Sequence, residues 1–233
     1  MLALLAYDMT DIATRLVDCV IFNTSDAARY IIKSGQVDLD ARDRDGDTLL
    51  KTCVFKNNIE IAELLITSSC DMDARDLSRY TTLHKCVSYN RLEIAELLTA
   101  NRCDMDVYGT HGCTALHECV FANRPEIAEL LVTNGCDMDT HYDFGVTALH
   151  HCVRRHCPEI AELLVTNGCD MGAIDARGRT ALELCYTPKS GDVKAVLTIQ
   201  RTPLLIAAGS GNLERVEELV DEDVTSTRCQ RTA

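Results

Sequence analysis

The run from His150 to Cys157, HHCVRRHC, is the densest group of side chains that could bind a metal. Imidazole and thiolate groups are the usual zinc ligands, so the run raises the hypothesis of a zinc site. A structural zinc site needs four converging ligands, however, and helix neighbours such as His151 and Cys152 point about 100° apart. We therefore expect no metal and no other cofactor: His150 is structural, His151 faces a groove and His156 occupies a turn.

Thirteen cysteines could support thiol chemistry, but nine of them recur with a period of 33 residues. They form two series, namely Cys53, Cys86, Cys119, Cys152 and Cys185, and Cys70, Cys103, Cys136 and Cys169. Equivalent positions in stacked helical units lie about 8–10 Å apart, beyond the ~7 Å Cα separation that a disulfide spans. Disulfides within a series are therefore excluded, while bonds between the two series remain open. We expect the cysteines to act as small apolar side chains of a protein in a reducing compartment. No cysteine forms a unique pair with a base, as the nucleophile of a thiol enzyme would.

Aspartates recur in the loops as an acidic ladder that suggests calcium or a basic peptide as a ligand: Asp71, Asp73, Asp104, Asp106, Asp137, Asp139 and Asp170. The ladder lacks the glycine and the terminal glutamate of an EF-hand loop. Aspartate also accepts hydrogen bonds from nearby backbone N–H groups, so turn formation explains the ladder better. Gly209–Gly211 follow no predicted strand and predict a helix–helix turn, not a phosphate loop.

The elements that must position these residues also repeat every 33 residues, starting from Thr48, Thr81, Thr114, Thr147 and Thr180. Each threonine can cap the two-turn apolar segment that follows it, which we call helix 1. Asn57, Asn90 and Asn123 then predict a left-handed turn into a second amphipathic helix, helix 2. Pro125 and Pro158 suit the first position of helix 2. The chain is therefore built from helix pairs.

A loop rich in aspartate and glycine joins helix 2 to the next threonine and predicts a projecting hairpin, which we call a finger. One loop position suits a residue with positive φ, and it holds Gly46, Gly112, Gly145 and Gly178, with Arg79 in one copy.

Three motifs of this unit resemble the ankyrin repeat: TALHEC at 114–119, EIAELL at 126–131 and GCDMD at 135–139. The resemblance covers most of the chain and implies an all-α, ankyrin-like helical repeat solenoid of helix–turn–helix units with β-hairpin finger loops. It also implies that the threonine hydroxyl and the imidazole three residues on bond to each other and tie neighbouring units together. Lys51 and Glu183 replace that histidine in two copies. Cysteine stands where the family has alanine, and Asn between the helices where it has glycine.

The period also predicts the domain organisation, because Cys19 marks a degenerate copy and Thr180 to Thr202 spans only 22 residues. We expect a degenerate N-terminal capping repeat at 1–44, four regular repeats at 45–176, a truncated repeat at 177–198, a final repeat or the start of a second array at 199–224, and a flexible tail at 225–233.

Composition limits the partners of the chain. Its 233 residues are 46% apolar and 25% charged, which is typical of a folded soluble protein. The net charge of -13 argues against nucleic acid and accommodates a basic protein partner, although acidity also promotes solubility. No stretch approaches the ~20 apolar residues of a membrane span, so no membrane insertion is expected. The N-terminal MLALLAYDMT lacks a basic region, so we expect a cytoplasmic location, with the nucleus as an alternative.

Positions that differ between copies are free to specify a partner. The groove-facing positions of helix 1 include Phe55 and Ser88. Because binding sites favour aromatic and arginine side chains, we select ten candidates from helix 1 and the finger tips: Tyr80, Lys85, Tyr89, His111, Glu118, Phe121, Phe144, His151, Arg154 and Arg155.

We expect a non-catalytic protein–protein interaction scaffold or adaptor that binds through a concave helix-1 groove and the finger tips. Two alternatives remain: a metal-binding or thiol-dependent enzyme, and a fragment of a larger ankyrin-repeat signalling or adaptor protein.

Overall fold

The computed structural model describes residues 2–185 and 191–199, which divide into two compact units between Cys136 and Asp137. Apart from Ile199, the predicted final repeat at 199–224, its glycine turn and the tail at 225–233 lie outside the described residues. The predicted repeat boundaries before that point stay predictions.

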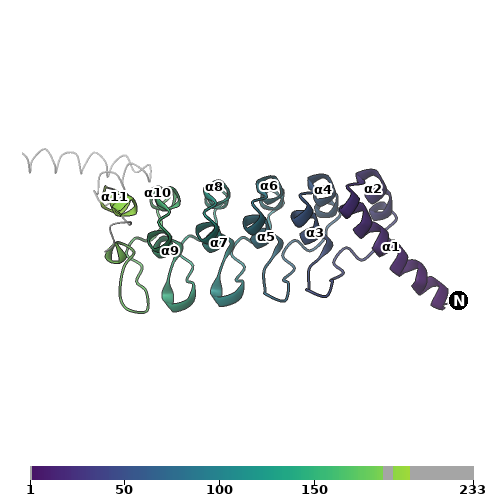
Figure 1. Ribbon diagram of the computed structural model, residues 1–233, viewed down its shortest axis with the longest axis horizontal. Coiled ribbons are helices and arrows are strands. Elements are labelled where there is room, and N and C mark those ends of the chain that lie inside the picture. The colour runs from purple at the N-terminus through teal and green to yellow at the C-terminus, as the bar shows by residue number, and fades with distance from the viewer. Residues whose placement is uncertain (1, 186–190, 200–233) are drawn as a thin grey trace, which may run out of the picture. The chain divides into compact units, whose positions relative to one another are not determined.

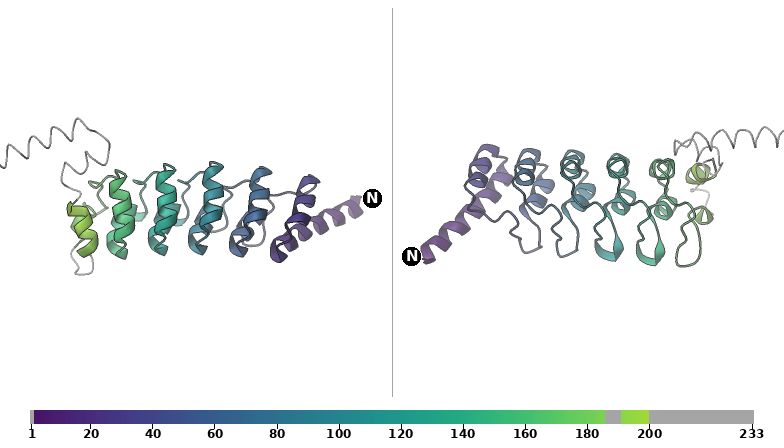
Figure 2. Two further views of the ribbon diagram at one scale, coloured as in Figure 1. Left: turned by 90° about the horizontal axis from the view of Figure 1, so that it is seen from above. Right: turned by 180° about the vertical axis from the view of Figure 1, so that it is seen from behind.

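Unit 1 consists of helix pairs that stack side by side, with the helix-1 members in one row and the helix-2 members in another (Figure 1). Its α-helices are α1 (Leu2–Phe22), α2 (Ser25–Lys33), α3 (Leu49–Lys56), α4 (Ile59–Thr67), α5 (Thr82–Tyr89), α6 (Leu92–Ala100), α7 (Ala115–Ala122) and α8 (Pro125–Thr133). The first turns of α1 extend away from α2 and α3 in every view (Figure 2).

Unit 2 has one regular pair, α9 (Ala148–Arg155) and α10 (Pro158–Thr166), followed by α11 (Gly191–Ile199). Where the 33-residue period fails, a three-residue 3-10 turn at Leu182–Leu184 takes the position of helix 1. Two further 3-10 turns form finger tips, Thr110–Gly112 in unit 1 and Asp143–Gly145 in unit 2.

The turns between helices 1 and 2 have the predicted left-handed backbone. Asn57, Asn90 and Asn123 have φ values of 58°, 55° and 50°, and His156 fills the same position at 59°. Pro125 and Pro158 occupy the first helical position, where no N–H is needed. The residues at the turn therefore determine how the chain reverses between the two helices of each pair.

The core of each repeat is apolar and includes the periodic cysteines. All twelve cysteines of the described residues are free and buried. Burial disfavours a thiolate and raises the pKa to about 12 for Cys53, Cys70, Cys103 and Cys169. At neutral pH these thiols stay protonated and act as small apolar side chains, as predicted.

The fingers contain little regular β-structure. Within residues 2–185 and 191–199 only isolated antiparallel bridges occur, Arg42 with Thr48 and Tyr142 with Val146. The helices of that part of the chain include none that is both long and apolar enough to span a bilayer.

Candidate functional site

Buried histidines join helix 1 of one repeat to the finger of the next. The hydroxyl of Thr81 lies 2.9 Å from Nδ1 of His84, and the Thr81 backbone N–H donates to the same nitrogen. Nε2 of His84 lies 3.0 Å from the carbonyl oxygen of Cys113, which only accepts, so Nε2 carries the proton. In unit 2, His150 repeats both bonds with Thr147 and the carbonyl of Arg179. These histidines are held in structural bonds.

Two repeats make this junction differently. Lys51 donates from Nζ to the Tyr80 carbonyl oxygen at 2.8 Å, while the hydroxyl of Thr48 is buried without a hydrogen-bond partner among the described residues. In unit 2, Oε2 of Glu183 accepts from the N–H of Thr180 at 2.7 Å and from its hydroxyl at 3.1 Å. Each substitute therefore forms the junction through different atoms from those of the imidazole.

Tyr80 and Glu118, both predicted partner-binding residues, contact each other. The Tyr80 hydroxyl donates to Oε1 of Glu118 at 3.0 Å, and the Cys113 thiol lies 3.5 Å from the same oxygen. The Tyr80 ring stacks on His84 with a centroid separation of 5.0 Å. A Cβ atom added at Gly109 would lie 2.5 Å from that ring. Polar atoms of Tyr80 and Glu118 are therefore already occupied by hydrogen bonds within unit 1.

Lys85 is also engaged within unit 1. Its Nζ lies 2.8 Å from Oδ2 of Asp76, whose other carboxylate oxygen accepts the N–H of Tyr80. Although partial burial opposes it, the bond to Asp76 raises the pKa of Lys85. Lys85 therefore remains charged and helps to hold the finger at 76–80.

An exposed aromatic pair lies on the helix-1 row of unit 1. Tyr89 of α5 is 42% exposed and Phe55 of α3 is 53% exposed, and their rings meet edge to face at 5.4 Å. Nζ of Lys56 lies 5.2 Å from the Phe55 ring centroid. Phe55 is not among the ten selected residues, although it stands at the repeat position of Phe121, which is half-buried on α7. Because Phe55 shares this repeat position with Phe121, the sequence alone could have added it to the selected residues.

The fingers have two kinds of turn. In three of them an aspartate at the base accepts N–H groups of its own loop, namely Asp43, Asp76 and Asp175. In the fingers at 109–113 and 142–146, Gly109 and Tyr142 replace that aspartate. Their tips hold His111 at φ 60° and Phe144 at φ 63°, a backbone conformation that is unfavourable for bulky residues. Both tip residues are exposed, and both are predicted binding residues.

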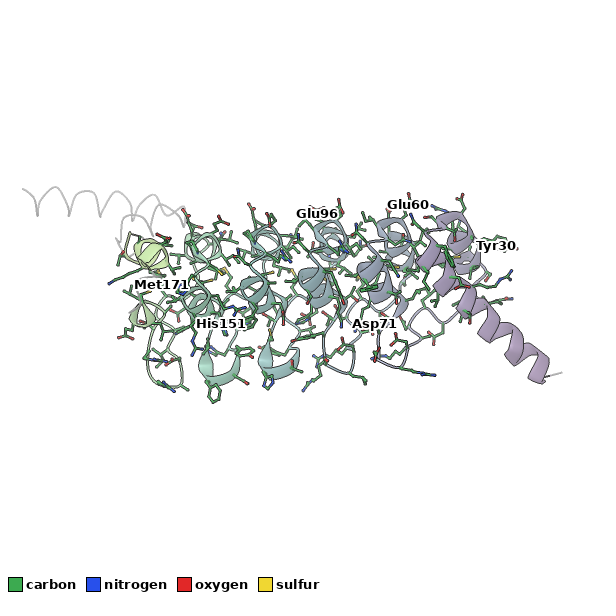
Figure 3. The ribbon with its side chains drawn as sticks, viewed as in Figure 1. Tyr30, Glu60, Asp71, Glu96, His151 and Met171 are labelled. Carbon is green, nitrogen blue, oxygen red and sulfur yellow. The ribbon has the colours of Figure 1, made fainter. Side chains whose placement is uncertain are left out.

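The remaining three candidates lie on α9 in unit 2. His151, labelled in Figure 3, is buried, and its ring meets Tyr142 edge to face at 5.1 Å. Arg154 and Arg155 are exposed in the last turn of the same helix. A role in binding for each of the ten residues stays a prediction.

The cluster at 150–157 does not present its ligands together. Both ring nitrogens of His150 are used by Thr147 and Arg179, and Cys157 is buried. Over the described stretches of the chain, no three His, Cys, Asp or Glu side chains group as a metal site would require.

Comparison with known families and structures completes this description. A family model of ankyrin repeats in three copies matches residues 69–142 and 116–198, and one of many copies matches 16–66. No curated protein has a sequence that matches the chain.

Solved structures share the fold. The ankyrin repeat protein EF0377 is 24% identical with a TM-score of 0.72, and an ankyrin repeat domain (ABAYE2397) of Acinetobacter baumannii AYE is 22% identical with 0.73. A chain in the complex of the predatory endopeptidase Bd0816 of Bdellovibrio bacteriovorus with the immunity protein Bd3460 is 22% identical, with 0.66. Each match covers 80% of this chain and 97% of the other.

Proposed function

Because the chain belongs to the ankyrin repeat family and has its all-α solenoid fold, we propose that it is a non-catalytic scaffold that binds a protein partner. Ankyrin repeats generally mediate protein–protein interaction. The binding surface that we propose consists of the helix-1 faces and the finger tips, where repeat proteins present extended surfaces to partners.

The observation that carries this proposal is the exposed pair of Phe55 and Tyr89. The apolar side chains of the repeat core are buried between helices, whereas these two rings meet each other at 5.4 Å and remain about half exposed. Tyrosine and other aromatic residues are enriched where protein interfaces gain most of their binding energy. The pair is therefore a suitable anchor for a partner.

Buried and bonded groups support a non-catalytic role. His84 and His150 use their imidazoles in junction bonds, and burial lowers the pKa of each. The thiol of Cys53, with its pKa of about 12, lacks the thiolate that nucleophilic catalysis needs. The Bdellovibrio structure adds that a chain of similar fold occurs in a complex between two proteins.

The test compares two variants of the full chain. Phe55→Ala/Tyr89→Ala removes the exposed aromatic pair, while Glu63→Ala/Glu96→Ala changes two exposed residues of helix 2; Glu96 is labelled in Figure 3. Tagged proteins of equal thermal stability are used to capture partners, which mass spectrometry identifies. We expect the aromatic variant alone to lose a partner. If both variants retain every partner of the wild type, the aromatic pair is not the binding surface.

A further inference from the structure

Three exposed arginines lie on helix 1 and on a finger of unit 2. Arg154 and Arg155 are exposed in the last turn of α9, and Arg177 is exposed in the finger at 175–179. The carboxylate of Asp175 lies 2.7 Å from Arg179 and compensates that arginine. By contrast, α10 carries the exposed acidic residues Glu159 and Glu162. Basic charge is therefore local in a chain whose net charge is -13.

Exposed apolar side chains accompany the arginines. Phe144 is 80% exposed and Ile174 is 57% exposed. Their loops are joined, because the Phe144 carbonyl oxygen accepts the N–H of Ala176 at 2.7 Å. Phe144 also has a φ of 63°, and strained backbone of this kind concentrates at functional sites. The finger tips of unit 2 thus present an apolar patch.

One contact links the apolar tip to the basic helix end. Tyr142, two residues before Phe144, packs edge to face on His151 at 5.1 Å. His151 lies three and four residues before Arg154 and Arg155, a spacing that places all three on one face of α9. The finger that carries Phe144 therefore packs through Tyr142 against α9, the helix whose last turn carries the two arginines.

We propose that this surface of unit 2 binds an acidic peptide segment of a partner protein that contains an apolar side chain. The apolar side chain contacts Phe144 and Ile174, and carboxylates of the segment pair with Arg154, Arg155 and Arg177. Guanidinium groups bind carboxylates through two parallel hydrogen bonds, which gives direction as well as attraction. This inference rests on the proposed function and specifies the chemistry of the partner.

The charge of the whole chain favours the opposite choice, a basic partner. That argument averages over both units, whereas a peptide responds to charges within about 8–10 Å at physiological salt. On this side of unit 2 we expect the exposed guanidinium groups of Arg154 and Arg177 to set the preference locally.

The probes are fluorescent synthetic peptides in which one phenylalanine, leucine or tryptophan is flanked by glutamates. Matched peptides carry lysine or glutamine in place of glutamate. Binding to the full chain is measured by fluorescence anisotropy at low and at physiological salt. We expect at least tenfold tighter binding of a glutamate peptide than of its lysine counterpart, with weaker binding at higher salt. Equal binding of the two, or no binding by any glutamate peptide, overturns the proposal.

Three variants locate the site. Arg154→Glu/Arg155→Glu is expected to weaken the glutamate peptide at least tenfold, and Phe144→Ser about threefold to tenfold, in line with loss of an apolar contact. Arg29→Glu/Lys33→Glu makes the same charge change at exposed positions of α2 and is expected to retain binding. If the α2 variant loses as much affinity as the α9 variant, the effect is net charge and the proposed site is wrong.

Two outcomes distinguish a failure of this inference from a failure of the proposed function. If no acidic peptide binds while Phe55→Ala/Tyr89→Ala still loses a captured protein, the scaffold function stands and the acidic partner is wrong. A single-stranded oligonucleotide that binds through Arg154 and Arg155 more tightly than every glutamate peptide also overturns the acidic partner.

Discussion

His84 and Lys51 occupy the same position in consecutive repeats of unit 1, yet they bond differently. The imidazole bonds back to Thr81 and forward to the carbonyl of Cys113. The ammonium of Lys51 donates forward to the carbonyl of Tyr80 but makes no bond to the Thr48 hydroxyl. Both forward bonds span 29 residues, so in each of these two repeats a donor on helix 1 reaches the next finger. The bond back to the threonine is missing at Lys51, and its absence leaves the Thr48 hydroxyl buried without a hydrogen-bond partner among the described residues.

The largest effect is expected for Lys51→Met. Its Nζ is surrounded by the Tyr80 carbonyl and the carboxylates of Asp47 and Asp76 at 3.7 and 3.9 Å. Removing the cation should lower the free energy of unfolding by about 3 kcal/mol, because buried Asp76 loses compensating charge. Urea denaturation followed by circular dichroism measures the change. Lys33→Met, at an exposed position of α2, is the control, and equal losses in the two variants would contradict this account.

A matched pair of threonine substitutions tests the backward bond. Thr81→Val should cost about 1–2 kcal/mol, because it removes the hydroxyl bonded to His84 at 2.9 Å. Thr48→Val should change stability by less than about 0.5 kcal/mol, because that buried hydroxyl already lacks a partner among the described residues. The same denaturation experiment compares them. Similar losses at both positions would show that the two junctions do not differ as described.

Lowering the pH should distinguish the histidine junctions from the lysine junction. Burial lowers the pKa of His84 and of His150 from 6.5, so below that pH the unfolded chain binds more protons than the folded chain. Their contribution is complete above pH 6.5 and is lost as the pH falls through that value. We expect the melting temperature to fall between about pH 7 and pH 5, and less steeply in His84→Gln. An unchanged slope in that variant would contradict the prediction.

A small effect is also expected at the third version of the junction. Glu183 is exposed, and its carboxylate accepts the N–H and the hydroxyl of Thr180. Glu183→Gln keeps an accepting oxygen but removes the charge, so we expect a loss of about 0.5 kcal/mol. Thermal unfolding of the full chain measures this change, with the exposed Glu159→Gln as its control. A loss above that of Thr81→Val would reverse the proposed ranking.

The sequence was sufficient to predict the fold, because local backbone requirements identify its turns. Asn57 and His156 both adopt the left-handed conformation that a turn between helices needs, and Arg79 adopts it in place of glycine. Hydrogen bonds between residues three apart close two of these turns, from the N–H of Asn57 to the carbonyl of Val54 and from the N–H of Arg79 to the carbonyl of Asp76. The family model then extends the same organisation over residues 69–198.

The candidate site was harder to predict, because its contacts join residues far apart in the chain. Tyr80 and Glu118 bond across 38 residues, and His151 lies buried beneath Tyr142. Variation between copies identified these positions but not whether their polar atoms face a partner or each other. The two kinds of finger can be distinguished in the sequence, because Gly109 and Tyr142 replace the aspartate at the base of the finger. How this replacement changes the backbone of the tip could be learned only from the three-dimensional structure.

The buried cysteines allow the local unfolding of each repeat to be measured separately. Cys53 and Cys70 in one repeat, and Cys86 and Cys103 in the next, are shielded from solvent while their helices are packed. An alkylating reagent can modify them only when that packing opens, and the rate reports the local unfolding equilibrium. Because the chain carries such thiols at regular intervals, peptide mapping after brief alkylation would rank the repeats by stability without a single added label.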